Sequence, residues 1–135
     1  MSFYLDAIFS PNKTPFSPSR LQRVPQNPIL RVNPRNWWES SAVFNPAVLY
    51  LDNKFHFLYR AIGGTYVSVL GYASSHDGIH IDERLSEPAY LSEQADSCKK
   101  PSESSVQSPY VSGGSISGCE DHRNTKIDDK IYMTY

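Results

Sequence analysis

Two segments of this chain share one layout and align without a gap. Residues 44–59 read FNPAVLYLDNKFHFLY, and residues 120–135 read EDHRNTKIDDKIYMTY. Each segment has a polar turn, then a lysine, then an alternating aromatic and aliphatic run, which is the pattern of a β-hairpin. A repeat of this kind predicts a fold built from successive β-units. Because only three of the sixteen positions are identical, two unrelated hairpins of similar appearance are the alternative.

The first repeat and the residues after it have the pattern of four short antiparallel strands. Alternation starts at Ala47 and continues to a turn at Asp52, and the chain returns over residues 55–61. Residues 65–74 are rich in β-branched and aromatic side chains and predict a third strand, and residues 79–82 (IHID) predict a short fourth one. Four strands in about 40 residues match one blade of a β-propeller. The sequence therefore predicts an all-β fold.

The rest of the chain divides into an arm and a partial propeller. Residues 1–36 contain most of the ten prolines, which exclude regular helix and central strand, so we expect a proline-rich extended N-terminal arm. Residues 37–135 are expected to hold blade one, a long loop over residues 85–117, and the start of blade two. Because the second repeat stops level with the middle of a strand in the first, we expect an open strand edge and self-association through it.

Charge and composition exclude several classes of function. With 13 basic and 14 acidic residues the net charge is −1, so the chain lacks the positive surface that a nucleic acid or an anionic membrane attracts. The N-terminus has no signal-peptide pattern, and no segment approaches the roughly 20 apolar residues of a membrane span. We expect a cytoplasmic protein. Cys98 and Cys119 are expected to be free thiols, and with the scattered histidines they predict no metal site.

The repeat also predicts a group of site residues. It aligns Asn45 with Asp121, each just before the strand that begins its unit. Equivalent positions of successive propeller blades meet around the central axis, so the two side chains should face one pocket, and Arg60 at the end of the returning strand could reach it. The alternative is that Asn45 and Asp121 only form turn hydrogen bonds. On a strand, Glu120 would point to the opposite face from Asp121, so a pair of catalytic carboxylates is not expected.

Five strings of this chain, in their order and spacing, resemble the N-terminal part of the mannoside phosphorylases and mannosidases of glycoside hydrolase family 130. The resemblance implies a five-bladed β-propeller with its active site at the axis, of which this chain would hold the first blade and the opening of the second. The strings are NPIL (27–30), VFNPAVLYLDNKFHFLYRA (43–61), LGYASSHDGIH (70–80), EPAY (87–90) and SGCEDHRNTKIDDKIYMTY (117–135).

The resemblance also implies residue roles. Asp121 falls where the family has its general acid, and Asn45 and Arg60 fall where it has ligands of the sugar to be cleaved. Arg123 is expected to buttress Asp121 or to line the pocket, and the alternative is an exposed arginine on the blade rim. In the phosphorylases the reaction is inverting: inorganic phosphate, a co-substrate, attacks the anomeric carbon while the acid protonates the leaving oxygen through a sugar hydroxyl. No cofactor is implied. A carboxylic acid, a guanidinium and an amide suit these roles.

Two departures from the family leave two functions open. His122 replaces the proline of the family's Glu-Asp-Pro-Arg string, so the backbone beside Asp121 loses a fixed φ. The residues that hold phosphate in the phosphorylases belong to later blades. The first function is a glycosidase or glycoside phosphorylase acting on β-mannosides, with this chain inactive alone. The alternative is a non-catalytic truncated product or sugar-binding remnant. Trp37 and Trp38 either stack on a sugar or attach the arm to the blade.

Overall fold

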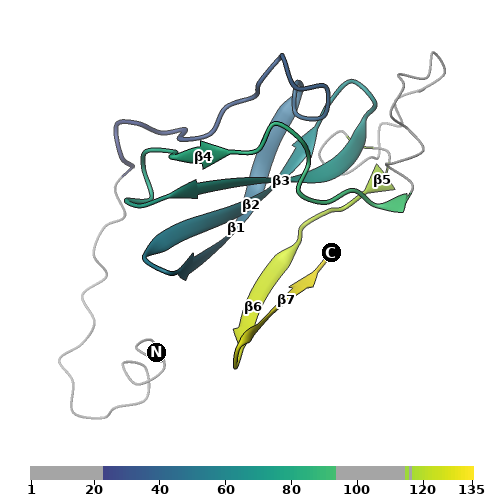
Figure 1. Ribbon diagram of the computed structural model, residues 1–135. Coiled ribbons are helices and arrows are strands. Elements are labelled where there is room, and N and C mark those ends of the chain that lie inside the picture. Colours follow the sequence, from purple (N-terminus) through teal and green to yellow (C-terminus); the bar gives the residue numbers. More distant parts are fainter. Residues whose placement is uncertain (1–22, 94–114, 116) are drawn as a thin grey trace, which may run out of the picture.

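The protein is built from β-strands, as predicted, in two sheets that lie against each other (Figure 1). The computed structural model describes residues 23–93, 115 and 117–135, and all structural statements concern these residues. The strands are β1 (Ala42–Leu51), β2 (Lys54–Ile62), β3 (Val67–Ser75), β4 (Glu83–Arg84), β5 (Ser117–Gly118), β6 (Arg123–Ile127) and β7 (Lys130–Thr134).

The first sheet has the strand order of a single blade. Strands β1 to β4 are antiparallel neighbours in chain order, and β5 joins the far end of β3 in parallel. The turn between β1 and β2 consists of Asp52 and Asn53, which have φ angles of 48° and 59°. Aspartate and asparagine tolerate this left-handed conformation, and a two-residue turn of this hand matches the twist of the strands it joins. The polar turn thereby sets the register of the longest strands.

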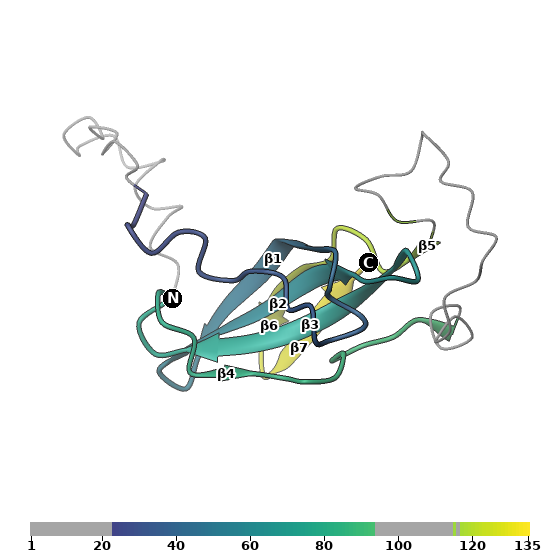
Figure 2. The same ribbon diagram turned by 90° about the horizontal axis from the view of Figure 1, so that it is seen from above.

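The second sheet is the β6–β7 hairpin, and its turn resembles that of the β1–β2 hairpin at the first position, whereas Asp129, unlike Asn53, is not left-handed. Asp128 in its turn has a φ of 51°, like Asp52 in the first hairpin. The aligned residues Asn45, inside β1, and Asp121, before β6, are also left-handed, at 47° and 44°. These paired backbone conformations confirm the repeat. Figures 1 and 2 show the second hairpin running alongside the first sheet, where β6 contacts β1.

Strand β1 begins five residues before the predicted start at Ala47. It pairs with β2 on both sides of a register shift, with Phe44 opposite Arg60 and Ala47 opposite Leu58. Pro46 lies in this shift. Proline has no N–H to donate to the ladder, so it is tolerated where the ladder is irregular. The predicted start of the strand was wrong because β1 also includes Ala42 to Phe44, on the N-terminal side of Pro46.

The predicted fourth strand over residues 79–82 is wrong, since these residues form turns and bends before β4. Asp77 explains the difference. Its Oδ1 accepts hydrogen bonds from the backbone N–H groups of Ile79 and His80, at 2.8 and 2.7 Å, and its Oδ2 contacts the His80 imidazole at 2.6 Å. These bonds, led by the one with the His80 side chain, lower the pKa of Asp77. An aspartate that binds nearby backbone in this way competes with strand pairing.

The described part of the N-terminal arm is folded into turns instead of being extended. Hydrogen bonds from the Asn27 N–H to the Val24 carbonyl and from the Asn36 N–H to the Asn33 carbonyl close two of these turns. Leu30, with its neighbour Ile29, packs against the core of the first sheet. Residues 1–22 of the predicted arm lie outside the described residues.

Both described ends of the predicted loop over residues 85–117 are attached to β3. Tyr90 forms a bridge with Leu70, and Ser117 begins β5 opposite Val67. The loop boundary at residue 117 was therefore one residue too late, because Ser117 already belongs to a strand. Residues 94–114 and 116 lie outside the described residues.

A buried polar group beneath the first sheet joins the N-terminal segment to β2 and β4. Glu39, which is fully buried, accepts a hydrogen bond from the Tyr59 hydroxyl at 2.8 Å and forms an ion pair with Arg84 at 2.5 Å. Burial is the main cause of the raised pKa of Tyr59. Trp38 stacks near Tyr59 and donates its indole N–H to the Ser86 carbonyl. Trp38 is 1% exposed, so of its two predicted roles it has the structural one.

Gly71 allows Tyr59 to lie flat against β3, and an added methyl group should be destabilising. A Cβ at Gly71 would lie 2.4 Å from the Tyr59 ring, whereas a Cβ at Gly64 would meet no atom within 4 Å. We expect Gly71→Ala to lower the free energy of unfolding by about 1–3 kcal/mol, the usual cost of overpacking a core. Urea unfolding followed by tryptophan fluorescence measures it, with Gly64→Ala as the matched control. Equal stability of the two variants would contradict the close packing.

Candidate active site

The structure brings three of the predicted site residues together where the two sheets meet. The Asn45 side-chain amide donates a hydrogen bond to Asp121 Oδ1 at 2.6 Å, and Arg60 Nη1 lies 3.7 Å from the same oxygen. Asn45 precedes the regular part of β1, Arg60 lies on β2, and Asp121 precedes β6. The left-handed backbone at both Asn45 and Asp121 turns the two side chains toward each other across the repeat. Asn45 and Asp121 therefore contact each other, and not only their own turns.

Arg60 is the centre of this cluster, and its side chain is 1% exposed. Its Nε donates to Ser68 Oγ at 2.8 Å, and its Nη2 donates to Ser115 Oγ at 2.8 Å. Its guanidinium also lies over the Phe44 ring, 4.9 Å from the centroid. A buried guanidinium with this many partners is held in one orientation. Arg60 can therefore present a fixed positive edge toward Asp121.

The strand pattern predicted that Glu120 and Asp121 point to opposite faces, but both side chains reach Arg60. Its Oε1 lies 2.6 Å from Arg60 Nη2 and accepts a second hydrogen bond from Ser115 Oγ at 2.6 Å. The expectation assumed a strand, whereas Glu120 and Asp121 lie in the connection between β5 and β6, where Asp121 has a left-handed φ. Both acidic side chains consequently reach the same guanidinium, with Glu120 as the closer ion-pair partner.

The chemistry available to the two carboxylates differs. Glu120 is 36% exposed, and its Oε1 is already shared by two donors. Asp121 is 57% exposed, with one hydrogen bond from an amide and a guanidinium within ion-pair distance. A carboxyl group at the protein surface, oriented through one oxygen, can exchange a proton with a bound molecule. Glu120 instead compensates the buried charge of Arg60.

Arg123 is exposed and supports the backbone on either side of the Asp121–His122 peptide. Its Nη1 donates to the carbonyl oxygens of Asp121 and His122, at 3.0 and 2.9 Å. Arg123 therefore contacts the main chain of Asp121 and not its carboxylate. This geometry combines the two predicted alternatives, since the side chain lies on the rim and braces the acidic residue.

Sequence reasoning missed the partners that hold Arg60: Ser68, Ser115 and Glu120. One feature of the sequence predicts that Arg60 has polar partners of some kind. Arg60 interrupts the apolar run FLYRAI, and a charged residue in a buried strand requires polar partners. Their identity could not be read from sequence because Ser115 and Glu120 lie more than fifty residues away along the chain.

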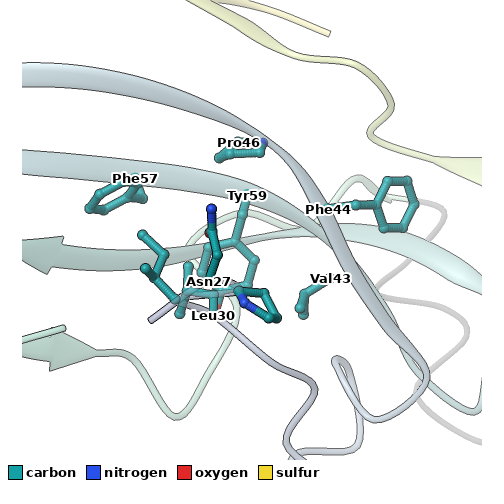
Figure 3. Close-up of a pocket in the computed structure, with 9 residues that line it drawn as sticks. Asn27, Leu30, Val43, Phe44, Pro46, Phe57 and Tyr59 are labelled. Carbon is teal, nitrogen blue, oxygen red and sulfur yellow. The ribbon is translucent and has the colours of Figure 1, made fainter. Parts of the chain in front are cut away.

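An apolar pocket of the first sheet lies beside this cluster, and Phe44 and Pro46, on either side of Asn45, belong to its lining. This pocket of about 160 Å³ lies between the N-terminal segment and the strands β1 and β2, near Leu30, Val43 and Tyr59 (Figure 3). None of its lining residues is charged, so it offers no group for acid–base chemistry. The Asn45–Arg60–Asp121 cluster is therefore the better candidate site.

The described part of the chain has neither a metal-binding cluster nor a membrane-spanning helix. In residues 23–93, 115 and 117–135, no group of three or more His, Cys, Asp and Glu side chains could hold a metal ion. Within the same residues, no helix has the length and apolar character needed to cross a membrane.

Comparison with known proteins identifies relatives over most of the chain. The family model for the β-1,4-mannooligosaccharide phosphorylases of glycoside hydrolase family 130 matches residues 20–135. A β-1,2-mannobiose phosphorylase from Thermoanaerobacter sp. (strain X514) is 38% identical over 129 residues, which cover 86% of this chain and 36% of the relative. A 1,2-β-oligomannan phosphorylase from the same strain is 37% identical and covers 86% of this chain and 35% of its own length.

A solved structure supports the fold assignment. The glycosyl hydrolase from Bacteroides ovatus is 26% identical, with a TM-score of 0.61, over 83% of this chain and 32% of its own. Such neighbours support a β-propeller-like fold. The chain spans about a third of the length of the relatives it matches. Because the family model covers more than half of this chain, the chain belongs to glycoside hydrolase family 130.

Proposed function

We propose that the protein takes part in the cleavage of β-mannosides by an inverting mechanism, with Asp121 as the general acid. The observation that supports this proposal is the cluster itself: an exposed carboxyl group, oriented by Asn45 and placed beside the buried guanidinium of Arg60. The matched relatives are phosphorylases of β-1,2-linked mannosides, which makes a mannoside the first substrate to test.

In this proposal Asn45 and Arg60 bind the mannose unit whose glycosidic bond breaks. An amide and a guanidinium in fixed positions can hold sugar hydroxyls in one orientation, and orientation itself lowers the barrier. Asp121 gives its proton to the leaving oxygen, through a hydroxyl of the sugar, as the C–O bond breaks. Inorganic phosphate forms the new bond to the anomeric carbon in phosphorolysis, and water does so in hydrolysis. No further cofactor is required.

The complete site needs more than the residues of this chain. The chain spans about a third of its relatives, and we propose that the full enzyme is a five-bladed propeller whose other blades supply the phosphate-binding groups. Residues 1–135 alone are then expected to bind mannosides weakly and to be inactive. A sugar-binding protein without catalytic activity is the second candidate, and the observation that favours it is His122, which replaces the proline beside the acid in the family's string.

A binding and turnover experiment distinguishes these functions. The 135-residue chain is titrated with β-1,2-mannobiose and β-1,4-mannobiose while the Asn45 side-chain amide is followed by NMR. In parallel, a chimera is made in which this chain replaces the aligned third of the Thermoanaerobacter β-1,2-mannobiose phosphorylase. Both proteins are assayed for mannose 1-phosphate and mannose, with and without phosphate.

We expect the chain to bind without turnover and the chimera to release mannose 1-phosphate only when phosphate is present. Release of mannose regardless of phosphate would assign the site to hydrolysis instead. A folded chimera that binds mannosides without cleaving them would favour the sugar-binding candidate. No binding by either protein would refute both functions.

A further inference from the structure

His122 is a buried titratable residue with no role in the proposed reaction. Its side chain is fully buried, and its Nε2 lies 2.8 Å from the Leu58 carbonyl oxygen. A carbonyl only accepts hydrogen bonds, so Nε2 is the nitrogen that bears hydrogen. The other ring nitrogen, Nδ1, is buried with no hydrogen-bond partner among the described residues. The imidazole therefore makes one directed hydrogen bond across the two sheets.

The location of this bond connects it to the site. Leu58 lies on β2, two residues before Arg60, and pairs with Ala47 directly after the ladder irregularity at Pro46. His122 follows Asp121 directly in sequence. One hydrogen bond thus joins the backbone next to the acidic side chain to the strand that holds the buried guanidinium.

We infer that His122 is a positioning residue that holds Asp121 against Asn45 and Arg60 through its bond to the Leu58 carbonyl. Such a restraint fixes the orientation of Asp121, whose backbone has a left-handed φ of 44°, a region that aspartate tolerates but that few residues with a side chain occupy. The Arg123 contacts with neighbouring carbonyls come from the exposed rim. His122 supplies the restraint from the buried side, where water does not compete.

This role differs from simple filling of space between the sheets. If only volume mattered, leucine at position 122 would serve as well as histidine. If the directed bond matters, the donor must be at the position of Nε2. Glutamine places an N–H donor near that position, whereas asparagine places its donor near Nδ1 and falls short. The series His122→Gln, His122→Asn and His122→Leu therefore separates the donor from the volume.

The first readout needs no substrate. In the 135-residue chain, long-range ¹H–¹⁵N NMR of His122 should show hydrogen on Nε2. The Asn45 side-chain amide should be protected from exchange in the unsubstituted chain and in His122→Gln, and unprotected in His122→Asn and His122→Leu. Hydrogen on Nδ1 alone, or equal protection of the Asn45 amide in all variants, would overturn the inference. The tautomer is measured in the unsubstituted chain, so it tests the His122–Leu58 hydrogen bond even if a variant fails to fold.

The second readout rests on the proposed function. β-1,2-Mannobiose binding, measured by NMR titration, should weaken by up to about tenfold in His122→Leu and His122→Asn, the effect of losing one hydrogen bond. His122→Gln should restore affinity to within about twofold of the original. Unchanged affinity in His122→Leu would overturn the positioning role. If no form of the protein binds mannobiose, the proposed function fails, while the Asn45 amide still tests the role of His122.

Discussion

Replacing Arg84 with methionine is expected to lower the free energy of unfolding by about 3–5 kcal/mol, the usual cost of leaving a buried charge without its partner. Glu39 is fully buried, and Arg84 Nη2 is 2.5 Å from its Oε2. Arg84 Nε also donates to the Tyr59 hydroxyl at 3.1 Å. Without Arg84, the Glu39 carboxylate keeps neutral donors only, one of them the Tyr59 hydroxyl. Urea unfolding, followed by tryptophan fluorescence, gives the change.

The double variant Glu39→Gln/Arg84→Met is the control for this interpretation. It removes both charges, so it should recover much of the lost stability, because an uncharged buried pair has no desolvated ion to compensate. Arg84→Lys should lie between, since lysine keeps the charge but lacks the fork that reaches both Glu39 and Tyr59. If Arg84→Met lowers the free energy of unfolding by less than about 1 kcal/mol, the Glu39–Arg84 ion pair contributes no more than a solvent-exposed ion pair does.

The hairpins could be predicted because their signals are local. Asp52 and Asn53 in one repeat and Asp128 in the other favour left-handed backbone, and alternating side chains follow each turn. Neighbouring residues decide such features, so a short stretch of sequence is enough. The repeat added the one long-range element of the prediction, since it aligned Asn45 with Asp121 across 76 residues.

The errors arose where a side chain far along the sequence, or a competing local bond, decides the backbone. Asp77 binds the N–H groups of Ile79 and His80, so the fourth strand forms at Glu83–Arg84 and not over residues 79–82. Glu120 reaches Arg60 because it lies in the connection between β5 and β6 and not on a strand. Neither outcome follows from hydrophobic periodicity, which reports burial and not hydrogen-bond partners.

His122 shows most clearly why part of the site could not be predicted. Its sequence context suggested only the loss of a proline and of the fixed φ that proline gives. The structure shows a hydrogen bond to Leu58, 64 residues away. In the family, the proline ring restrains the backbone next to the acid. Here the hydrogen bond from His122 to Leu58 on β2 restrains it instead. Such contacts require the strand register to be known first.

Replacing Asp121 with asparagine in the chimera is expected to lower kcat for β-1,2-mannobiose by about 10²–10⁴, the range that a general acid contributes. Asparagine tolerates the left-handed φ of this position and keeps an oxygen that can accept the Asn45 hydrogen bond. The fold and the binding of the mannoside should therefore persist while proton transfer is lost. Initial rates of mannose 1-phosphate release give kcat and KM separately.

Asp128→Asn is the matched control, because Asp128 is also exposed and left-handed but lies in the β6–β7 turn. It should leave kcat within about twofold. A second test uses a dinitrophenyl β-mannoside, whose leaving group departs as a stable anion and needs little protonation. If Asp121 is the acid, Asp121→Asn should lose far less activity on this substrate than on mannobiose. An equal loss on both substrates would mean that Asp121 binds the sugar without donating the proton.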